Sequence, residues 1–95
     1  MTKSDVLNYL SKHFQEFHHK YNVEKIGLFG SYARDEATKD SDIDIFVKMP
    51  PKIFDMVAIK DQIEEDLHTR VDIIREHKHM KPLFVEMIHK DLINV

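Results

Sequence analysis

Two aspartates separated by a single residue are the feature of this sequence with the clearest chemical consequence. Asp42 and Asp44 belong to the alternating segment Asp42–Lys48, whose period of two predicts a β-strand. Alternate residues of a strand point to the same side and lie roughly 6.6 Å apart along it. Two carboxylates placed in this way repel each other unless a cation or a shared proton compensates. The pair is therefore a candidate site for a divalent cation such as Mg²⁺, and the alternative of a strand end whose aspartates face water stays open on this feature alone.

Two further features strengthen this interpretation. Gly30-Ser31 directly follows a short apolar segment, and a glycine there lets backbone amides approach a phosphate closely while the serine hydroxyl donates to it. Asp72 is the single acid in the apolar run Val71–Ile74, so we expect it to be buried and to need a positive partner. Gly-Ser alone is an ordinary turn, but three acids and such a turn together predict a two-metal phosphoryl-transfer site.

The elements that position these residues follow from hydrophobic periodicity and from the turn residues. Thr2 or Ser4 is the predicted N-cap of the first helix, and Pro82 suits the first turn of the last one. The predicted order is a helix over 5–20, a strand over 25–30, a helical turn near 33–37, a strand over 42–48, a helix over 54–68, a strand over 70–75 and a helix from 82. This order predicts an α+β fold with α/β layers, a small mixed three-stranded sheet with helices packed against it.

Each of the three longer helices has an apolar face that we assign to the core. The assigned residues are Leu7, Leu10, Phe14 and Phe17 in the first helix, Met56, Ile59, Ile63 and Leu67 in the second, and Leu83, Phe84, Met87 and Ile88 in the third. A surface that normally contacts a partner would have the same pattern, and the sequence does not distinguish the two.

The composition excludes several classes of protein. A chain of 95 residues fits one domain, residues 1–95, and the absence of cysteine excludes disulfides and thiolate chemistry. No segment has the character of a signal peptide or a membrane span, so we expect a cytoplasmic protein without membrane contact. With 14 Lys and Arg against 17 Asp and Glu, the net charge of −3 disfavours nucleic acid as the main ligand. The 7 histidines lack metal-binding spacing and are interpreted as solvated.

The motif residues resemble a known superfamily. Gly30-Ser31, ten intervening residues and Asp42-Ile-Asp44 are similar to the signature of the nucleotidyltransferase superfamily that includes DNA polymerase beta, and Asp72 matches its third acid on a later strand. The stretch Gly27–Ile45 is especially similar to the minimal nucleotidyltransferases of bacteria and archaea. The resemblance extends over nearly the whole chain, through the ending Leu92-Ile-Asn-Val95.

The resemblance implies a role for each acid. Asp42 and Asp44 would bind the two Mg²⁺ ions that hold the triphosphate of ATP or of another nucleoside triphosphate. Asp72 would complete the metal site and help to orient the attacking hydroxyl. The implied reaction is an in-line attack on the α-phosphate with pyrophosphate as the leaving group.

The resemblance also implies roles for the turn. Ser31 and the amides around Gly30 would hold the terminal phosphates. Arg34 follows the serine by three residues, where relatives often carry an arginine that contacts phosphate; the alternative is an ordinary solvated arginine.

The acceptor would come from a partner, because larger members of the superfamily have additional domains for it and this chain has none. Minimal nucleotidyltransferases are typically encoded beside a helical HEPN-domain protein, often an RNase toxin. The resemblance implies an antitoxin that transfers AMP to a tyrosine of that toxin, in a hetero-oligomer. One alternative is a module that neutralises its partner by contact and has a vestigial nucleotide site. Another is transfer to a small molecule such as an antibiotic, for which 95 residues leave little room.

Overall fold

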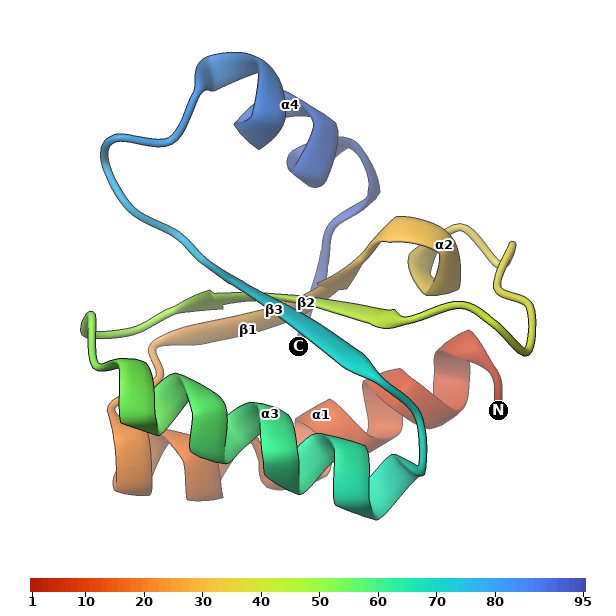
Figure 1. Cartoon of the computed structure of the whole chain (residues 1–95), viewed down its shortest axis with the longest axis horizontal. Helices are drawn as coiled ribbons and strands as arrows, with labels where there is room; N and C mark the ends of the chain where they lie inside the picture. The colour runs from red at the N-terminus through yellow and green to blue at the C-terminus, as the bar shows by residue number, and fades with distance from the viewer.

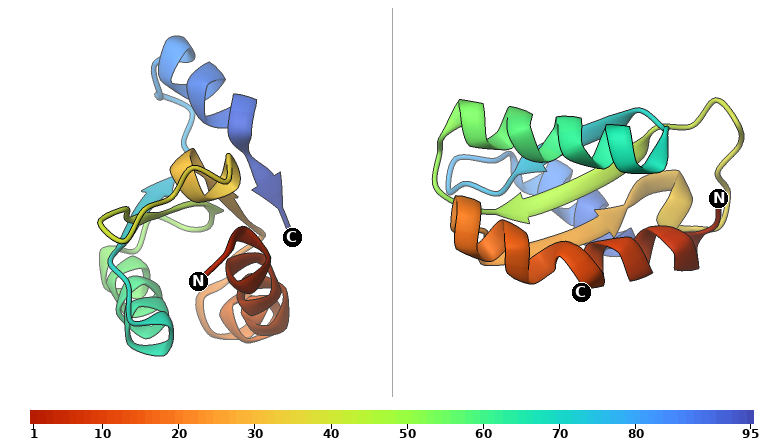
Figure 2. Two further views of the ribbon diagram at one scale, coloured as in Figure 1. Left: turned by 90° about the vertical axis from the view of Figure 1, so that its right-hand side faces the viewer. Right: turned by 90° about the horizontal axis from the view of Figure 1, so that it is seen from below.

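A four-stranded sheet with helices on both faces forms the molecule (Figure 1). The computed structural model describes all 95 residues. The elements are α1 (Lys3–Tyr21), β1 (Lys25–Phe29), α2 (Gly30–Ala33), β2 (Ile43–Lys48), α3 (Ile53–Leu67), β3 (Val71–Arg75), α4 (Pro82–Asp91) and β4 (Ile93–Asn94). Helices α1 and α3 lie side by side under one face of the sheet, and α2 and α4 lie on the other face (Figure 2). The mixed α and β architecture predicted from the sequence is confirmed.

The strand order is β3-β2-β1-β4, with β2 and β3 parallel and the other two pairs antiparallel. The prediction of three strands was wrong, because β4 has only two residues and so carries no periodic pattern. Gly27 on β1 allows this pairing. A Cβ at that position would lie 2.7 Å from the Leu92 side chain and 2.9 Å from the Ile93 carbonyl oxygen.

The main core lies between the sheet and the helices α1 and α3. The alternation of β2 places Ile43, Ile45 and Val47 on this face, where all three are fully buried. Of the predicted helix residues, Leu10, Phe17, Ile59 and Ile63 are fully buried, and Leu7, Phe14, Met56 and Leu67 pack partly buried at the edge of the cluster. The same alternation places Asp44 on the opposite face of β2, away from the main core.

The prediction for α4 was wrong for three of its four residues. Ile88 is buried, but the exposed fractions are 70% for Leu83, 42% for Phe84 and 62% for Met87. Helix α4 packs on the sheet through its C-terminal part, where Ile88 is buried and the His89 ring lies 5.8 Å from that of Phe46. Its N-terminal part rises away from the sheet (Figure 1).

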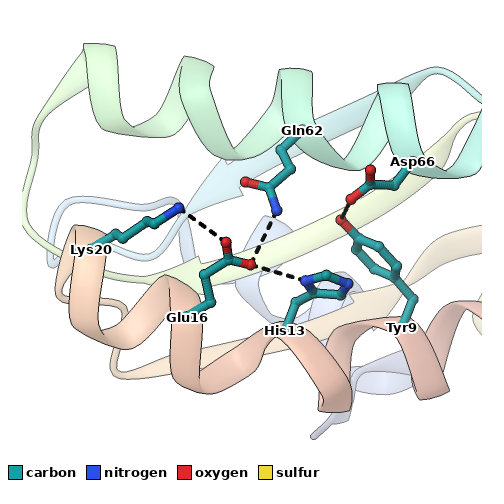
Figure 3. Close-up of polar contacts among 6 residues, drawn as sticks. All are labelled: Tyr9, His13, Glu16, Lys20, Gln62 and Asp66. Carbon is teal, nitrogen blue, oxygen red and sulfur yellow. Dashed lines mark hydrogen bonds and ion pairs between the residues drawn. The ribbon is translucent and has the colours of Figure 1, made fainter.

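A polar cluster joins α1 to α3 (Figure 3). The Glu16 carboxylate accepts hydrogen bonds from Gln62 of α3 at 3.2 Å and from Lys20 at 3.0 Å, and it pairs with His13 at 3.0 Å. These partners lower the pKa of Glu16 to about 2.

Thr2 caps α1 with the full capping box, which confirms one of the two predicted caps. No helix of the protein combines the length and the apolar character needed to cross a membrane.

Candidate active site

The end of β1 and the start of β2 bring the glycine turn and the second aspartate together. Asp44 on β2 is the register partner of Phe29, the last residue of β1, and of Asp72 on β3. Gly30 follows Phe29 and begins α2. The antiparallel β1–β2 pair and the parallel β2–β3 pair thus place Gly30, Asp44 and Asp72 at the same end of these strands, on the face that carries α2 and α4.

The backbone conformation and the neighbouring Asp44 carboxylate both favour glycine at position 30. Its φ of 75° lies in the left-handed region, and a Cβ there would overlap the Asp44 carboxylate and lie 3.0 Å from its Cγ. The carboxylate therefore packs directly against backbone. Ser31 follows in the first turn of α2, whose N–H groups have no acceptor within the helix. The arrangement places hydrogen-bond donors beside a carboxylate, as a site for a metal-bound phosphate requires.

A cavity of about 300 Å³ opens at this point between the sheet and α4. One side of the cavity is lined by Phe29, Gly30, Ser31, Arg34 and Asp44. Helix α4 lines the other side with Phe84, Met87, Ile88 and Asp91. A larger hollow of about 600 Å³ around Arg75 and Lys78 contains none of the predicted site residues. None of the histidines lines the cavity beside Asp44.

The charge of Asp44 is opposed by its surroundings. Partial burial raises the pKa of the Asp44 carboxyl, the negative charges of Asp72 and Asp42 raise it further, and Arg34 acts in the opposite direction. A cation bound among these carboxylates would remove that repulsion, and carboxylate oxygens are the ligands that Mg²⁺ prefers.

The predicted burial of Asp72 was wrong: its side chain is exposed. Strand β3 is at the edge of the sheet, and α4 covers the face beside β1 rather than the face beside β3. The apolar neighbours of Asp72 in the sequence therefore do not indicate its own burial. Asp72 lies next to Asp44 with its carboxylate open to solvent.

Asp42 lies one residue before β2 and is also exposed. Its Oδ1 is 3.1 Å from Nε of Arg70, so this carboxylate already has a positive partner. No three acidic or histidine side chains surround one point closely enough to hold a metal ion. The carboxylate ligands fit a divalent cation. In the structure, however, Asp44 and Asp72 are neighbours on adjacent strands, whereas Asp42 forms an ion pair with Arg70.

Arg34 lies at the C-cap of α2 and lines the cavity, as a phosphate-contacting arginine would. Its Nη1 donates to Asp91 of α4 at 2.7 Å, and its Nε donates to Glu36 at 3.1 Å. Sequence reasoning missed Asp91, which is 57 residues away in the chain and has no motif around it.

Comparison with known proteins points to one family. The family model described as "Nucleotidyltransferase domain" matches residues 10–95. A Methanocaldococcus jannaschii protein provisionally named a protein adenylyltransferase is 34% identical over 96 residues, covering 99% of this chain and 98% of the relative. Protein adenylyltransferase MntA of Thermococcus cleftensis is 34% identical over 76 residues, covering 78% of this chain and 77% of its own length.

Solved structures have the same fold. One provisionally described as a minimal nucleotidyltransferase matches with a TM-score of 0.80 and 27% identity, covering 100% of this chain and 97% of its own. A chain from the complex of tri-AMPylated Shewanella oneidensis HEPN toxin with MNT antitoxin matches with a TM-score of 0.68 and 18% identity, covering 98% and 71%. A chain from a toxin–antitoxin complex with AMP-PNP matches with a TM-score of 0.69 and 17% identity, covering 99% and 72%.

Proposed function

This chain belongs to the nucleotidyltransferase domain family, and from that premise we propose that it is an antitoxin that transfers AMP from ATP to a tyrosine of a HEPN-domain RNase toxin. The observation that carries the proposal is the contact of Gly30 with the Asp44 carboxylate in the lining of the cavity. The relatives named protein adenylyltransferases support the reaction, and the fold shared with the toxin–antitoxin structures supports the kind of partner. ATP and such a partner meet in the cytoplasm, the compartment that the proposal implies.

The turn after β1 would bind the phosphates. The Ser31 hydroxyl and the free N–H groups of the first turn of α2 would donate hydrogen bonds to the terminal phosphates. Arg34 lines the same cavity and would add a charge-assisted contact. These donors would hold the phosphates beside the carboxylates of the neighbouring strands.

The three aspartates would hold two Mg²⁺ ions. Asp44 and Asp72 are adjacent in register, and Asp42 would exchange its contact with Arg70 for a contact with the cation. When bound, the ions would neutralise the charge of the phosphates and of the departing pyrophosphate. The raised pKa of Asp44 supports this role, because the protein leaves a repulsion there that a cation would relieve.

The acceptor would enter from the open side of the site. Its tyrosine oxygen would attack the α-phosphorus, the bond to the bridging oxygen of the β-phosphate would break, and pyrophosphate would leave. Asp72, exposed beside Asp44, is placed to orient the attacking hydroxyl and to accept its proton. The exposure of Asp72 supports an acceptor that arrives on another molecule.

The test uses the purified chain, the HEPN protein encoded beside it and MgATP, and records intact masses. We expect the partner to gain the mass of AMP, and peptide mapping to place it on a tyrosine. Asp42→Asn with Asp44→Asn should abolish the gain while the complex still forms. Asp40→Asn, an exposed carboxylate two residues before Asp42, is the matched control and should act like the wild type.

The outcomes separate this proposal from its alternatives. A stable complex without any mass change, together with full neutralisation of the toxin by the double variant, would identify a contact-only antitoxin. Transfer to a small molecule but not to the protein would identify the third function. Omission of Mg²⁺ should stop the transfer, and activity in the presence of a chelator would contradict the metal assignment.

A further inference from the structure

We propose that Asp91 is a positioning residue that orients Arg34 toward the phosphates of the bound nucleotide. This inference rests on the proposed function, because it assigns Arg34 to the phosphate chain. Asp91 belongs to the last turn of α4, and no motif of the sequence points to it. Its effect on the reaction would pass through Arg34 alone.

The contact between the two residues is short, and although the Arg34 side chain is 43% exposed, its acidic partner is largely covered. Oδ2 of Asp91 lies 2.7 Å from Nη1 of Arg34, and the Asp91 side chain is only 19% exposed. The second carboxylate on this guanidinium, from Glu36, is at 3.1 Å and is 65% exposed. Solvent screens an exposed ion pair far more than a shielded one, so Asp91 is the partner that determines where the guanidinium lies.

The guanidinium has donors left for a phosphate. An arginine has five N–H groups, and the two carboxylates use Nε and Nη1. Nη2 makes no hydrogen bond within the chain. Arg34 lines the same cavity as Ser31 and Asp44, and its charge acts on the carboxyl of Asp44. Two of its nitrogens are therefore held by the protein, while the third keeps its donors available on a side chain that lines the cavity.

The position of Asp91 is an unfavourable one for an acid. The C-terminal end of a helix carries partial negative charge, and α4 otherwise has His89 and Lys90 in its last turn. An aspartate there is repelled by the helix end and stabilised by Arg34. The residue therefore adds little to the stability of α4 by itself, which favours a role toward the arginine.

Asp91 also links α4 to the turn. Apart from Asp91, α4 presents only apolar side chains to the cavity: Phe84, Met87 and Ile88. The ion pair is the polar connection between α4 and the α2 turn, so the placement of the guanidinium depends on the docking of α4.

The test measures the affinity of the full chain for MgATP and for AMP by calorimetry. For Asp91→Asn we expect the affinity for MgATP to fall by about tenfold, the effect of losing one charge-assisted hydrogen bond, and the affinity for AMP to stay within about twofold. Asp91→Glu should restore most of the loss. Glu36→Gln is the matched control, with the same arginine partner and an exposed carboxylate, and should change neither affinity by more than about twofold.

A cycle with Arg34→Ala tests the route of the effect. Adding Asp91→Asn to Arg34→Ala should cause no further loss of MgATP affinity. Arg34→Lys is a second variant for the case in which Asp91→Asn loosens α4. The lysine keeps the positive charge but lacks the planar set of donors of a guanidinium, so it should show the same selective loss of affinity for MgATP.

Three results would overturn the role of Asp91: tighter or unchanged MgATP binding, an equal loss for AMP, or an additive loss in the double variant. Tighter binding would mean that Asp91 competes with the phosphate for Arg34. Failure of the wild type to bind MgATP would contradict the proposed function itself, and the two failures are thereby distinguished.

Discussion

At the scale of single residues, the site conflicts with the stability of the fold. Asp44 is partly buried beside two other carboxylates, and the backbone of Gly30 lies in contact with it. The partial burial and the neighbouring charges oppose the ionised form of Asp44, and neither improves the packing of the core. Such a conflict is typical of groups that are retained for a ligand.

The first prediction follows from the raised pKa of Asp44. The folded state holds this proton more tightly than the unfolded state, so the free energy of unfolding falls as the pH rises from the ordinary value of 3.8 through the raised pKa. The penalty is fully present at neutral pH. We therefore expect Asp44→Asn to raise the melting temperature at pH 7, with a gain that shrinks as the pH is lowered through the raised pKa and is lost below the ordinary value of 3.8.

Thermal melts over a series of pH values check this expectation, with Asp40→Asn as the exposed control. Mg²⁺ should raise the melting temperature of the wild type and have a much smaller effect on Asp44→Asn. A variant no more stable than the wild type at pH 7 would show that the neighbouring charges do not strain the folded state.

At the scale of helices and strands, the sequence was sufficient wherever a pattern was local. The period of two assigned β2 to the sheet and Asp44 to the face opposite the core, and Thr2, one of the two predicted N-caps, caps α1. The buried faces of α1 and α3 followed from helical spacing. For α4 the same spacing was misleading, because periodicity shows that a helix has an apolar face but not whether this chain covers it.

The residues of the site were likewise predictable where they belong to a local motif, and their surroundings were not. Gly30, Ser31 and Asp44 belong to one local motif, and the structure brings them together. The exposure of Asp72 depends on the place of β3 at the edge of the sheet, which no local pattern shows. The pairing of Arg34 with Asp91 depends on the docking of α4, 57 residues further along the chain.

The second prediction concerns the docking of β4. Gly27→Ala would place a methyl group against the Ile93 carbonyl oxygen, a backbone atom that cannot turn away. We expect a loss of about 1–3 kcal/mol, the usual range for overpacking, and loosened pairing of β4 with β1. Denaturant unfolding and amide exchange of Val95, which donates to Ile26, check the two effects.

Leu92→Ala provides the control for this variant. Added to Gly27→Ala, it should restore only part of the stability, because it removes the side-chain overlap and leaves the overlap with the Ile93 carbonyl. Complete restoration would show that the side chain alone limits position 27.

At the scale of the whole molecule, the two faces of the sheet are buried unequally. The face toward α1 and α3 holds the large cluster of fully buried side chains, and a polar network joins these helices at their outer side (Figure 3). On the other face, Ile88 is the only buried residue of α4. Local stability should follow this difference, since regions with few buried apolar contacts open at lower free energy.

The third prediction is therefore that α4 and β4 open before the rest of the molecule. In native-state hydrogen exchange, their amides should exchange through partial opening, and those of α1, β1 and β2 should exchange only through global unfolding. MgATP should slow the exchange of the α4 amides, because a nucleotide bound in the cavity that α4 lines would stabilise the docked helix. Uniform protection across α4 and β1 would contradict the expected difference.

The contact of Gly30 with Asp44 also has an evolutionary consequence. As long as the carboxylate is selected, substitution at position 30 is disfavoured, because a Cβ there would overlap the Asp44 side chain as it stands. In a duplicated gene that has lost the activity and the aspartate, the overlap disappears and only the positive φ still favours glycine. Asparagine and aspartate tolerate that backbone conformation, so they should be the first residues to replace glycine in such copies. A lineage that keeps the partner but has lost catalysis should therefore be recognisable from paired changes at these two positions.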